Sequence, residues 1–301
     1  MIKQLWRKFG INPLDRLLKK AVKRNQTKFL LCWNRGLGDI ALGMYALVYR
    51  IRHFIPDANI TFVTRSDLAE GFRLLENITL LIDPAMKRKQ PFDLDAALES
   101  NGLKRSDFDV ILEHPDPTYW LKWQLGTLVP RLHFLPEWDA LHQLFAINPA
   151  KRCIGVHVHS ETSYGYEKNW PHAYWQEFFN EITRDGQVQI LLFGHTPTPL
   201  FPLEGVIDLR GKTTLAEMLS LLKNTCQTLV VPDSGVLSLV YFLDAEFPLK
   251  IVSLWADPNQ GVLKQNVASP NPLLIHVPLR APEKDLRKLT VEQVLQEVRA
   301  C

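Results

Sequence analysis

The chain has 301 residues, of which 46% are hydrophobic and 22% are charged, proportions typical of a folded globular protein and not of a disordered or collagen-like chain. This length suits two domains of ordinary size. The net charge of +3 is too small to indicate nucleic-acid binding, and no aromatic and basic recognition motif accompanies it. The cysteines are too far apart for a metal-ligand spacing or a disulfide framework, so we expect reduced thiols at Cys32, Cys153, Cys226 and Cys301.

The opening segment, from Lys3 to Lys28, interleaves basic and apolar residues in the manner of a basic amphipathic helix. Two interpretations stay open. The favoured one is a helix packed on the first domain with a solvated basic face, and the other is contact with a membrane surface. The sequence has no apolar run of about 18 residues and no secretory leader, so we expect a cytoplasmic protein whose basic segment offers a peripheral contact with the inner face of the membrane.

Strands and helices are predicted to alternate along the first half of the chain. Short apolar runs predict strands, and longer periodic segments predict helices. The strands are expected at 29–33, 59–64, 79–82 and 109–112, and the helices at 40–54, 67–75 and 140–147. Asn148-Pro149 is the predicted domain boundary, because proline disfavours a helix before it.

The same alternation restarts after residue 150. Strands are expected at 153–158, 187–193, 206–209, 228–231 and 250–254, and helices at 171–184, 215–222, after Gly235, and at 291–300. Alternating strands and helices predict parallel sheets covered on both faces. The expected fold is therefore α/β, with two Rossmann-like parallel-sheet domains, 1–150 and 151–301, facing a cleft where ligands collect beyond the carboxyl ends of the strands.

The first loop after a strand runs from Asn34 to Asp39. Its two glycines, Gly36 and Gly38, permit a tight turn and the close approach of a ligand. Asp39 stands at the start of a helix, where it suits either a general base or a helix cap. The Gly36-Leu37-Gly38 pattern is a weak dinucleotide fingerprint, because no acidic residue marks the end of the second strand.

Two loops of the second half carry further polar groups. The loop 159–171 places hydroxyl groups and Lys168 before a helix, which suits a phosphate or diphosphate, although a solvated lysine is the alternative. The loop Pro232-Asp233-Ser234-Gly235 exposes backbone amides beside a carboxylate. It can hold sugar hydroxyls and phosphate oxygens, or simply cap its helix.

Four motifs in order resemble the family 9 glycosyltransferases, the bacterial lipopolysaccharide heptosyltransferases and their relatives. They are Gly38-Asp39, Lys168-Asn169-Trp170-Pro171, the segment 208–215 and Asp233-Ser234-Gly235, and the resemblance spans roughly residues 29 to 255. It implies the GT-B type of architecture, with an acceptor-binding domain at 1–150 and a nucleotide-sugar-binding domain at 151–301. It also implies ADP-heptose as the default donor and a lipopolysaccharide core or other glycoconjugate as the acceptor.

The mechanism expected from this resemblance is an inverting transfer without metal or cofactor. Asp39 removes the proton of the acceptor hydroxyl, and Lys168 stabilises the departing diphosphate. Asp233 binds hydroxyls of the donor sugar, with the amides near Ser234 and Gly235 on the phosphates. The remaining assignments are Ser163 and Thr213 around the diphosphate or nucleoside, and Arg35, Gly36 and Gly38 in the acceptor loop.

Two other functions stay open. Where the family often has a histidine, three residues after the glycine of the last motif, this chain has Ser238, which allows a non-catalytic nucleotide-sugar-binding protein. The glycines of the first loop allow a nicotinamide-dependent oxidoreductase. Metal binding is not expected at Asp93-Leu94-Asp95, which opens a helix, or at His157 and His159, which share a strand face without a third ligand.

Overall fold

The computed structural model describes residues 12–161 and 166–300, and the chain divides into two compact units, the first ending at Pro130 and the second beginning at Arg131. The segment 131–150, predicted to end the first domain, packs within the second unit. Its stretch η5 (Pro136–Leu144) lies against α8 (Leu215–Asn224), and the backbone N–H of His142 donates to Ser220 Oγ at 2.9 Å.

The α-helix predicted at 140–147 is wrong, because η5 is a 3₁₀-helix. The reason lies in its contacts with α8. The carbonyl of Asp139 accepts hydrogen bonds from Ser220 Oγ at 2.9 Å and Asn224 Nδ2 at 3.0 Å. A carbonyl engaged by a neighbouring helix competes with the regular α-helical ladder, and 3₁₀ turns are common in such connectors.

The first unit is built on a four-stranded parallel sheet in the order β3-β2-β1-β4. All three pairings are parallel, as the alternation of strands and helices predicts. β1 occupies the interior of the sheet, so that its residues from Phe29 onward are buried. The strands are β1 (Lys28–Trp33), β2 (Asn59–Thr64), β3 (Ile78–Ile82) and β4 (Val110–Leu112).

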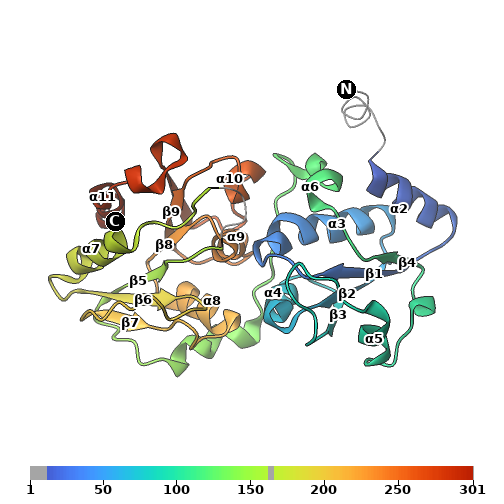
Figure 1. Ribbon diagram of the computed structural model, residues 1–301, viewed down its shortest axis with the longest axis horizontal. Helices are drawn as coiled ribbons and strands as arrows, with labels where there is room; N and C mark the ends of the chain where they lie inside the picture. Colours follow the sequence, from blue (N-terminus) through green and yellow to red (C-terminus); the bar gives the residue numbers. More distant parts are fainter. Residues whose placement is uncertain (1–11, 162–165, 301) are drawn as a thin grey trace. The chain divides into compact units, whose positions relative to one another are not determined.

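Helices cover both faces of this sheet. Leu94, Ala97 and Leu98 of α5 pack with Leu30 and Cys32 of β1 in one apolar core. Figure 1 shows α2 and α3 on the opposite side of the sheet from α5. The helices of the unit are α2 (Pro13–Lys23), α3 (Tyr45–Phe54), α4 (Ala69–Arg73), α5 (Leu94–Glu99) and α6 (Pro117–Trp120).

The basic helix α2 packs on the first unit through its apolar face. Leu14, Leu18 and Ala21 are buried, and Asp15 pairs with Arg50 of α3 at 2.7 Å. The basic side chains of the other face are exposed. The favoured interpretation of the basic segment is therefore confirmed for residues 13–23, and the part before residue 12 lies outside the described residues. In the described part of the chain, no helix has the length and apolar character needed to span a bilayer.

The second unit is built on a six-stranded parallel sheet in the order β10-β9-β8-β5-β6-β7. β5 and β8 lie side by side in its middle, and all five pairings are parallel. The loops after these two strands therefore meet at one edge of the sheet. The strands are β5 (Arg152–His157), β6 (Val188–Phe193), β7 (Val206–Asp208), β8 (Thr228–Pro232), β9 (Leu249–Trp255) and β10 (Leu274–Arg280).

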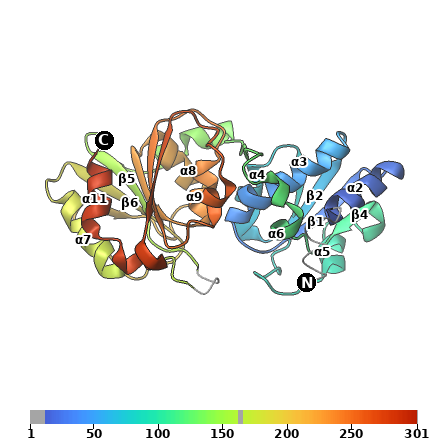
Figure 2. The ribbon, with the colours of Figure 1, turned by 90° about the horizontal axis from the view of Figure 1, so that it is seen from above.

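Figure 2 shows α7 and α11 on one side of this sheet and α8 and α9 on the other. The aromatic side chains of Trp175, Phe178 and Phe179 on α7 fill the core on the first side. On the other side β5 carries Gly155, where an added Cβ would lie 2.6 Å from Leu222 Cδ2, so the glycine lets α8 approach closely. The remaining helices are α7 (His172–Thr183), α9 (Gly235–Tyr241), α10 (Gly261–Gln265) and α11 (Val291–Arg299).

Candidate active site

Asp39 folds back on its own loop in the first unit. Its Oδ2 accepts a hydrogen bond from the backbone N–H of Gly36 at 3.1 Å, and its own N–H donates to the Gly36 carbonyl at 3.3 Å. The side chain makes no capping bond to the following helix. The capping interpretation of Asp39 is therefore wrong, because its carboxylate closes the Gly36-Leu37-Gly38 turn instead.

The helix after Asp39 opens with a π-helical turn, η1 (Ile40–Met44), before it becomes the regular α3. The N–H of Tyr45 donates to the carbonyl of Ile40, five residues earlier. The buried amide of Gln124 donates to the Leu42 carbonyl at 2.7 Å. Single π turns of this kind occur often at functional sites, because they widen the helix and redirect backbone groups.

The surroundings of Asp39 have opposing effects on its pKa. Burial raises the pKa of Asp39, while the Gly36 hydrogen bond and the cations Arg35, Arg88 and Lys89 lower it. Burial is the largest effect, so the pKa is raised above its ordinary value. A carboxylate of this kind accepts a proton more readily at neutral pH than an exposed aspartate does.

Arg88 and Lys89 reach this site through a contact that the sequence analysis did not identify. The amide of Asn34 donates to the carbonyls of Lys87 and Gln90, at 3.1 and 2.9 Å. The Asn34 carbonyl accepts from the N–H of Lys89 at 3.2 Å. The three consecutive cations Lys87-Arg88-Lys89 soon after a strand were the signal available in the sequence.

In the second unit, Lys168 and Asp233 form a buried ion pair. Lys168 Nζ donates to Asp233 Oδ2, and both side chains are about nine-tenths buried. Lys168 comes from the loop after β5 and Asp233 from the loop after β8, the two neighbouring strands in the middle of the sheet. The structure thus brings together two of the residues predicted for the donor site.

Short hydrogen bonds fix both loops. Ser160 Oγ donates to the carbonyl of Asp233 at 2.9 Å, which ties the β5 loop to the β8 loop. The side chain of Asn169 accepts from the Ser160 N–H at 2.5 Å and donates to the Ser160 carbonyl at 3.0 Å. Trp170, directly after these residues, is buried and donates from Nε1 to the Leu289 carbonyl at 2.8 Å. Ser160 is therefore a positioning residue that the sequence analysis did not single out.

The pKa of Asp233 is raised. Burial is the main cause, the neighbouring carboxylate of Asp257 adds to it, and the ammonium group of Lys168 opposes both. Asp257 follows β9, the next strand of the sheet. Two carboxylates and one buried ammonium group therefore lie close together at this edge.

Ser234 has the local role of an N-cap. Its Oγ accepts from the Leu237 N–H at 3.2 Å, and its carbonyl accepts from Ser238 Oγ at 3.1 Å. The capping interpretation therefore holds for Ser234, while Gly235 begins α9 beside Asp233. Ser238, which stands where the family often has a histidine, is buried and bonded within this helix.

Thr213, another residue predicted for the donor site, lies apart from this cluster in the order of the strands. Thr213 is half-buried and lies in the loop between the edge strand β7 and α8. It directly precedes Thr214, the N-cap of α8. β6 and β5 lie between β7 and β8 in the sheet. Ser163 lies outside the described residues.

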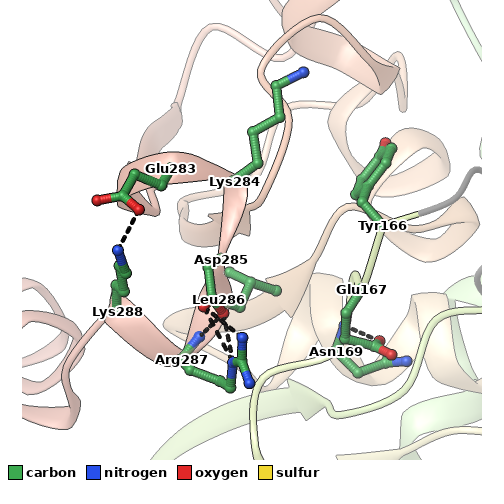
Figure 3. Close-up of a pocket in the computed structure, with 9 residues that line it drawn as sticks. All are labelled: Tyr166, Glu167, Asn169, Glu283, Lys284, Asp285, Leu286, Arg287 and Lys288. Carbon is green, nitrogen blue, oxygen red and sulfur yellow. Dashed lines mark hydrogen bonds and ion pairs between the residues drawn. The ribbon is translucent and has the colours of Figure 1, made fainter.

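A cavity of about 480 Å³ lies beside the Lys168 loop. Figure 3 shows its two sides, Tyr166, Glu167 and Asn169 on one and the segment 283–288 on the other. Lys168 Nζ lies 5.8 Å from the centre of the Tyr166 ring. The segment 283–288 follows β10, a strand absent from the sequence-based prediction.

The two histidines predicted to share a strand face lie in different environments. β5 ends at His157, which is buried, while His159 beyond the strand end is exposed. Burial lowers the pKa of His157 to about 4, and the nearby His159 and His195 contribute.

Asp93, in the segment where metal binding was not expected, caps α5. Its Oδ1 accepts a hydrogen bond from the Ala96 N–H at 3.1 Å. Within residues 12–161 and 166–300, no three His, Cys, Asp or Glu side chains are grouped to hold a metal ion.

Residues 137–245 match the family model described as glycosyltransferase family 9 (heptosyltransferase). This matched segment includes Lys168 and Asp233, and its similarity to the heptosyltransferases indicates a glycosyltransferase. The resemblance predicted from the sequence motifs is thus confirmed. The chain matches no curated protein sequence.

Solved structures of glycosyltransferases share the fold of this chain. The E. coli ADP-heptose lipopolysaccharide heptosyltransferase II matches with a TM-score of 0.64 at 16% identity, covering 91% of this chain and 98% of that chain. E. coli heptosyltransferase WaaC with ADP-2-deoxy-2-fluoro heptose has a TM-score of 0.55 at 15% identity, covering 90% and 99%. The iron-containing dodecameric glycosyltransferase TibC from enterotoxigenic E. coli has a TM-score of 0.50 at 16% identity, covering 91% and 76%. The predicted GT-B type fold with two parallel sheets is confirmed.

Proposed function

We propose that the protein transfers a sugar, by default heptose from ADP-heptose, to a hydroxyl group of a lipopolysaccharide core or another glycoconjugate. The observation that carries this proposal is the buried Lys168–Asp233 pair within the family 9 segment. An ammonium group with a carboxylate suits a donor that presents a diphosphate beside sugar hydroxyls. The ADP-heptose analogue bound to WaaC supports the choice of donor.

The transfer inverts the anomeric centre in one displacement. The acceptor oxygen forms a bond to the anomeric carbon as the bond to the diphosphate breaks, and the nucleoside diphosphate leaves. Asp39 takes the acceptor proton, a role that its raised pKa supports. Lys168 and the amides near Ser234 and Gly235 stabilise the charge that builds on the leaving group, and Asp233 binds hydroxyls of the donor sugar.

The first unit supplies the acceptor loop and the second supplies the donor site. Arg35, Gly36 and Gly38 line the acceptor loop in this proposal, and the cation Arg35 is exposed there. Lys168, Asp233, Ser234 and Gly235 belong to the second unit. In this proposal the proton acceptor Asp39 belongs to the first unit, and Lys168, the cation at the leaving group, belongs to the second.

No metal or other cofactor takes part in the proposed transfer, because Lys168 supplies the positive charge at the leaving diphosphate. Turnover is therefore expected to survive saturating EDTA. Loss of turnover with EDTA that Mg²⁺, Mn²⁺ or Fe²⁺ restores would show that the reaction needs a cation.

The protein works in the cytoplasm, where α2 packs on the first unit through its apolar face and contacts anionic lipid through its solvated basic face. The exposed basic side chains of this helix and its C-cap support this assignment, namely Arg16, Lys19, Lys20, Lys23 and Arg24. Flotation with phosphatidylglycerol vesicles tests it. Binding that salt removes, and that substitution of these five residues abolishes, is the expected result, while equal flotation with neutral phosphatidylcholine vesicles contradicts it.

A panel of nucleotides and nucleotide sugars tests the function directly. A ligand at a hundred times its Kd stabilises the fold by about 2.7 kcal/mol, which is measurable as a rise in Tm. We expect ADP-heptose and ADP to raise the Tm and NAD to leave it unchanged. A rise with NAD alone favours the oxidoreductase. Binding of ADP-heptose without release of ADP in the presence of acceptor favours the non-catalytic alternative that Ser238 suggests.

A further inference from the structure

A second lysine–aspartate pair lies next to the Lys168–Asp233 pair. Lys284 Nζ lies 3.1 Å from Asp257 Oδ2. Asp257 follows β9 and Asp233 follows β8, two paired strands, and the two carboxylates are close enough for Asp257 to raise the pKa of Asp233. Two ammonium groups therefore accompany two neighbouring carboxylates at one edge of the sheet.

The cavity of about 480 Å³ has a volume typical of small-molecule sites, and Glu167 and Asn169, the two sequence neighbours of Lys168, line it. Lys284 lines the cavity itself, on the side formed by the segment 283–288. Tyr166 lines the facing side, and its ring centre lies 5.8 Å from Lys168 Nζ. A ligand in this cavity can thus reach the Lys284 ammonium group and lies beside the loop that carries Lys168.

Lys284 is held differently from the other cations of the cavity. Arg287 is bound by Asp285 at 2.8 to 3.1 Å and Lys288 is paired with Glu283, both within the same short segment. Lys284 instead reaches back to the loop after β9. Its backbone has a φ of +59°, a left-handed conformation that is uncommon for residues other than glycine and that occurs often at functional sites.

When the Lys284 ammonium group leaves Asp257, that carboxylate still keeps two hydrogen bonds. Asp257 Oδ1 already accepts from the N–H and the side-chain amide of Asn259, at 3.0 and 3.1 Å. The Lys284 side chain is 58% exposed, so it keeps much of its rotational freedom. Transfer of this ammonium group from Asp257 to a ligand oxygen is therefore feasible within the present fold.

We propose that Lys284 binds the nucleoside-linked phosphate of the donor, while Lys168 binds the sugar-linked phosphate. This assignment rests on the proposed function, in which Asp233, the partner of Lys168, contacts the donor sugar. Lys168 contacts Asp233 directly, whereas Lys284 contacts Asp257 after the next strand, so Lys168 is the ammonium group nearer to the sugar hydroxyls. A diphosphate bridging two ammonium groups gains a charge-assisted hydrogen bond from each.

The test compares a nucleoside diphosphate with its monophosphate by isothermal titration calorimetry. ADP, GDP, UDP and CDP are screened on the wild-type protein, and the tightest binder is used with its monophosphate. Lys284→Asn removes the charge while keeping a side chain that tolerates the left-handed backbone, and Lys284→Arg retains the charge. Lys223→Asn is the matched control, because Lys223 pairs with Asp139 in the same unit and does not line the cavity.

The expected pattern is a crossed one. Lys284→Asn weakens the diphosphate and the monophosphate about tenfold each, whereas Lys168→Ala weakens only the diphosphate by a comparable factor. Lys284→Arg recovers most of the lost affinity, and Lys223→Asn binds like the wild type.

Three results overturn the proposal. In the first result, Lys284→Asn binds both nucleotides like the wild type. In the second, Lys284→Asn loses affinity for the diphosphate but not for the monophosphate. Either result shows that Lys284 does not bind the nucleoside-linked phosphate. A wild-type protein that binds none of the four nucleoside diphosphates refutes the proposed function as well. In the first two cases the proposed function survives, because the wild type still binds the donor nucleotide and Lys168→Ala still weakens it.

Discussion

At the scale of single residues, the candidate site depends on carboxylates that the fold partly withdraws from water. Asp39 and Asp233 both have raised pKa values for this reason, although each also has a partner that lowers the pKa. Asp39 is bonded to a backbone N–H and Asp233 to an ammonium group. The two residues are therefore suited to different tasks, proton transfer for Asp39 and the binding of polar donor groups for Asp233.

Asp39→Asn is expected to reduce kcat by on the order of a hundredfold or more, because the amide cannot accept the acceptor proton. Donor binding should remain within about twofold, since the amide oxygen can still accept the Gly36 N–H. Transfer kinetics together with titration of ADP measures both quantities. In the wild type, activity should rise with pH through the raised pKa of Asp39, where the carboxyl group loses its proton. A folded Asp39→Asn protein with wild-type kcat would place the general base elsewhere.

Lys168→Met is expected to lower the free energy of unfolding by about 3 kcal/mol, because it leaves the buried Asp233 without its ammonium partner. The double variant Lys168→Met/Asp233→Asn should recover at least half of this loss, since no uncompensated charge remains. Urea denaturation of the single and double variants measures the coupling. If the two single substitutions add without coupling, the ion pair contributes little to stability.

At the scale of secondary structure, the buried strands could be predicted from the sequence, whereas the edge strand β10 could not. β5 and β8 contain the apolar runs 153–156 and 229–232, so their residue types indicate the middle of a parallel sheet. β10 is an edge strand that contains Pro278 and leaves Ile275 61% exposed, so no clear apolar pattern marks it. Because the segment after β10 carries Lys284, this side of the cavity was not predicted from the sequence.

The candidate site shows the same division between local and long-range information. Asp39, Lys168 and Asp233 could be predicted because each lies in the loop between a recognisable strand and the helix that follows it. The contact of Asn34 with the segment 87–90 and that of Lys284 with Asp257 could not, because they join residues that are far apart in the sequence. Such contacts follow from strand order, which short motifs do not specify.

The π turn after Asp39 carries a prediction of its own. Gln124→Leu removes the hydrogen bond from the buried amide to the Leu42 carbonyl and should cost about 1–3 kcal/mol of unfolding free energy. We also expect a lower kcat, because η1 directly follows Asp39. Gln124→Glu keeps the size of the side chain but loses the N–H donor, so it should lower the stability as well. A variant with unchanged stability and activity would show that the π turn does not need this bond.

At the scale of the whole molecule, two parallel sheets each end in loops that carry one part of the proposed chemistry. The first sheet presents Asp39 after β1, and the second presents Lys168 and Asp233 after its two middle strands. Each unit has an apolar core of its own. The residues of the candidate site thus belong to loops on two independent scaffolds.

Global stability should fall as the pH drops from about 6.5 to about 4. His157 has a pKa of about 4 in the folded protein and 6.5 as its ordinary value, so in this window the unfolded chain binds more protons. Its contribution is complete above pH 6.5, is lost as the pH falls towards 4, and amounts to about 3 kcal/mol at most. His157→Gln should flatten the dependence of the unfolding free energy on pH, measured by urea titration at several pH values. An unchanged slope would contradict the burial of a neutral imidazole at this position.

The π turn at Ile40–Met44 also has an evolutionary consequence. A π turn holds one more residue than the α-helical turn it replaces, so it absorbs a single-codon insertion without shifting the rest of the helix. Deleting that residue would return the turn to α-helical geometry and rotate Asp39 by about 100° relative to α3. In a homologue that lacks one residue between positions 40 and 44, the side chain at position 39 should point in a different direction. We therefore expect that such homologues no longer keep an aspartate at position 39.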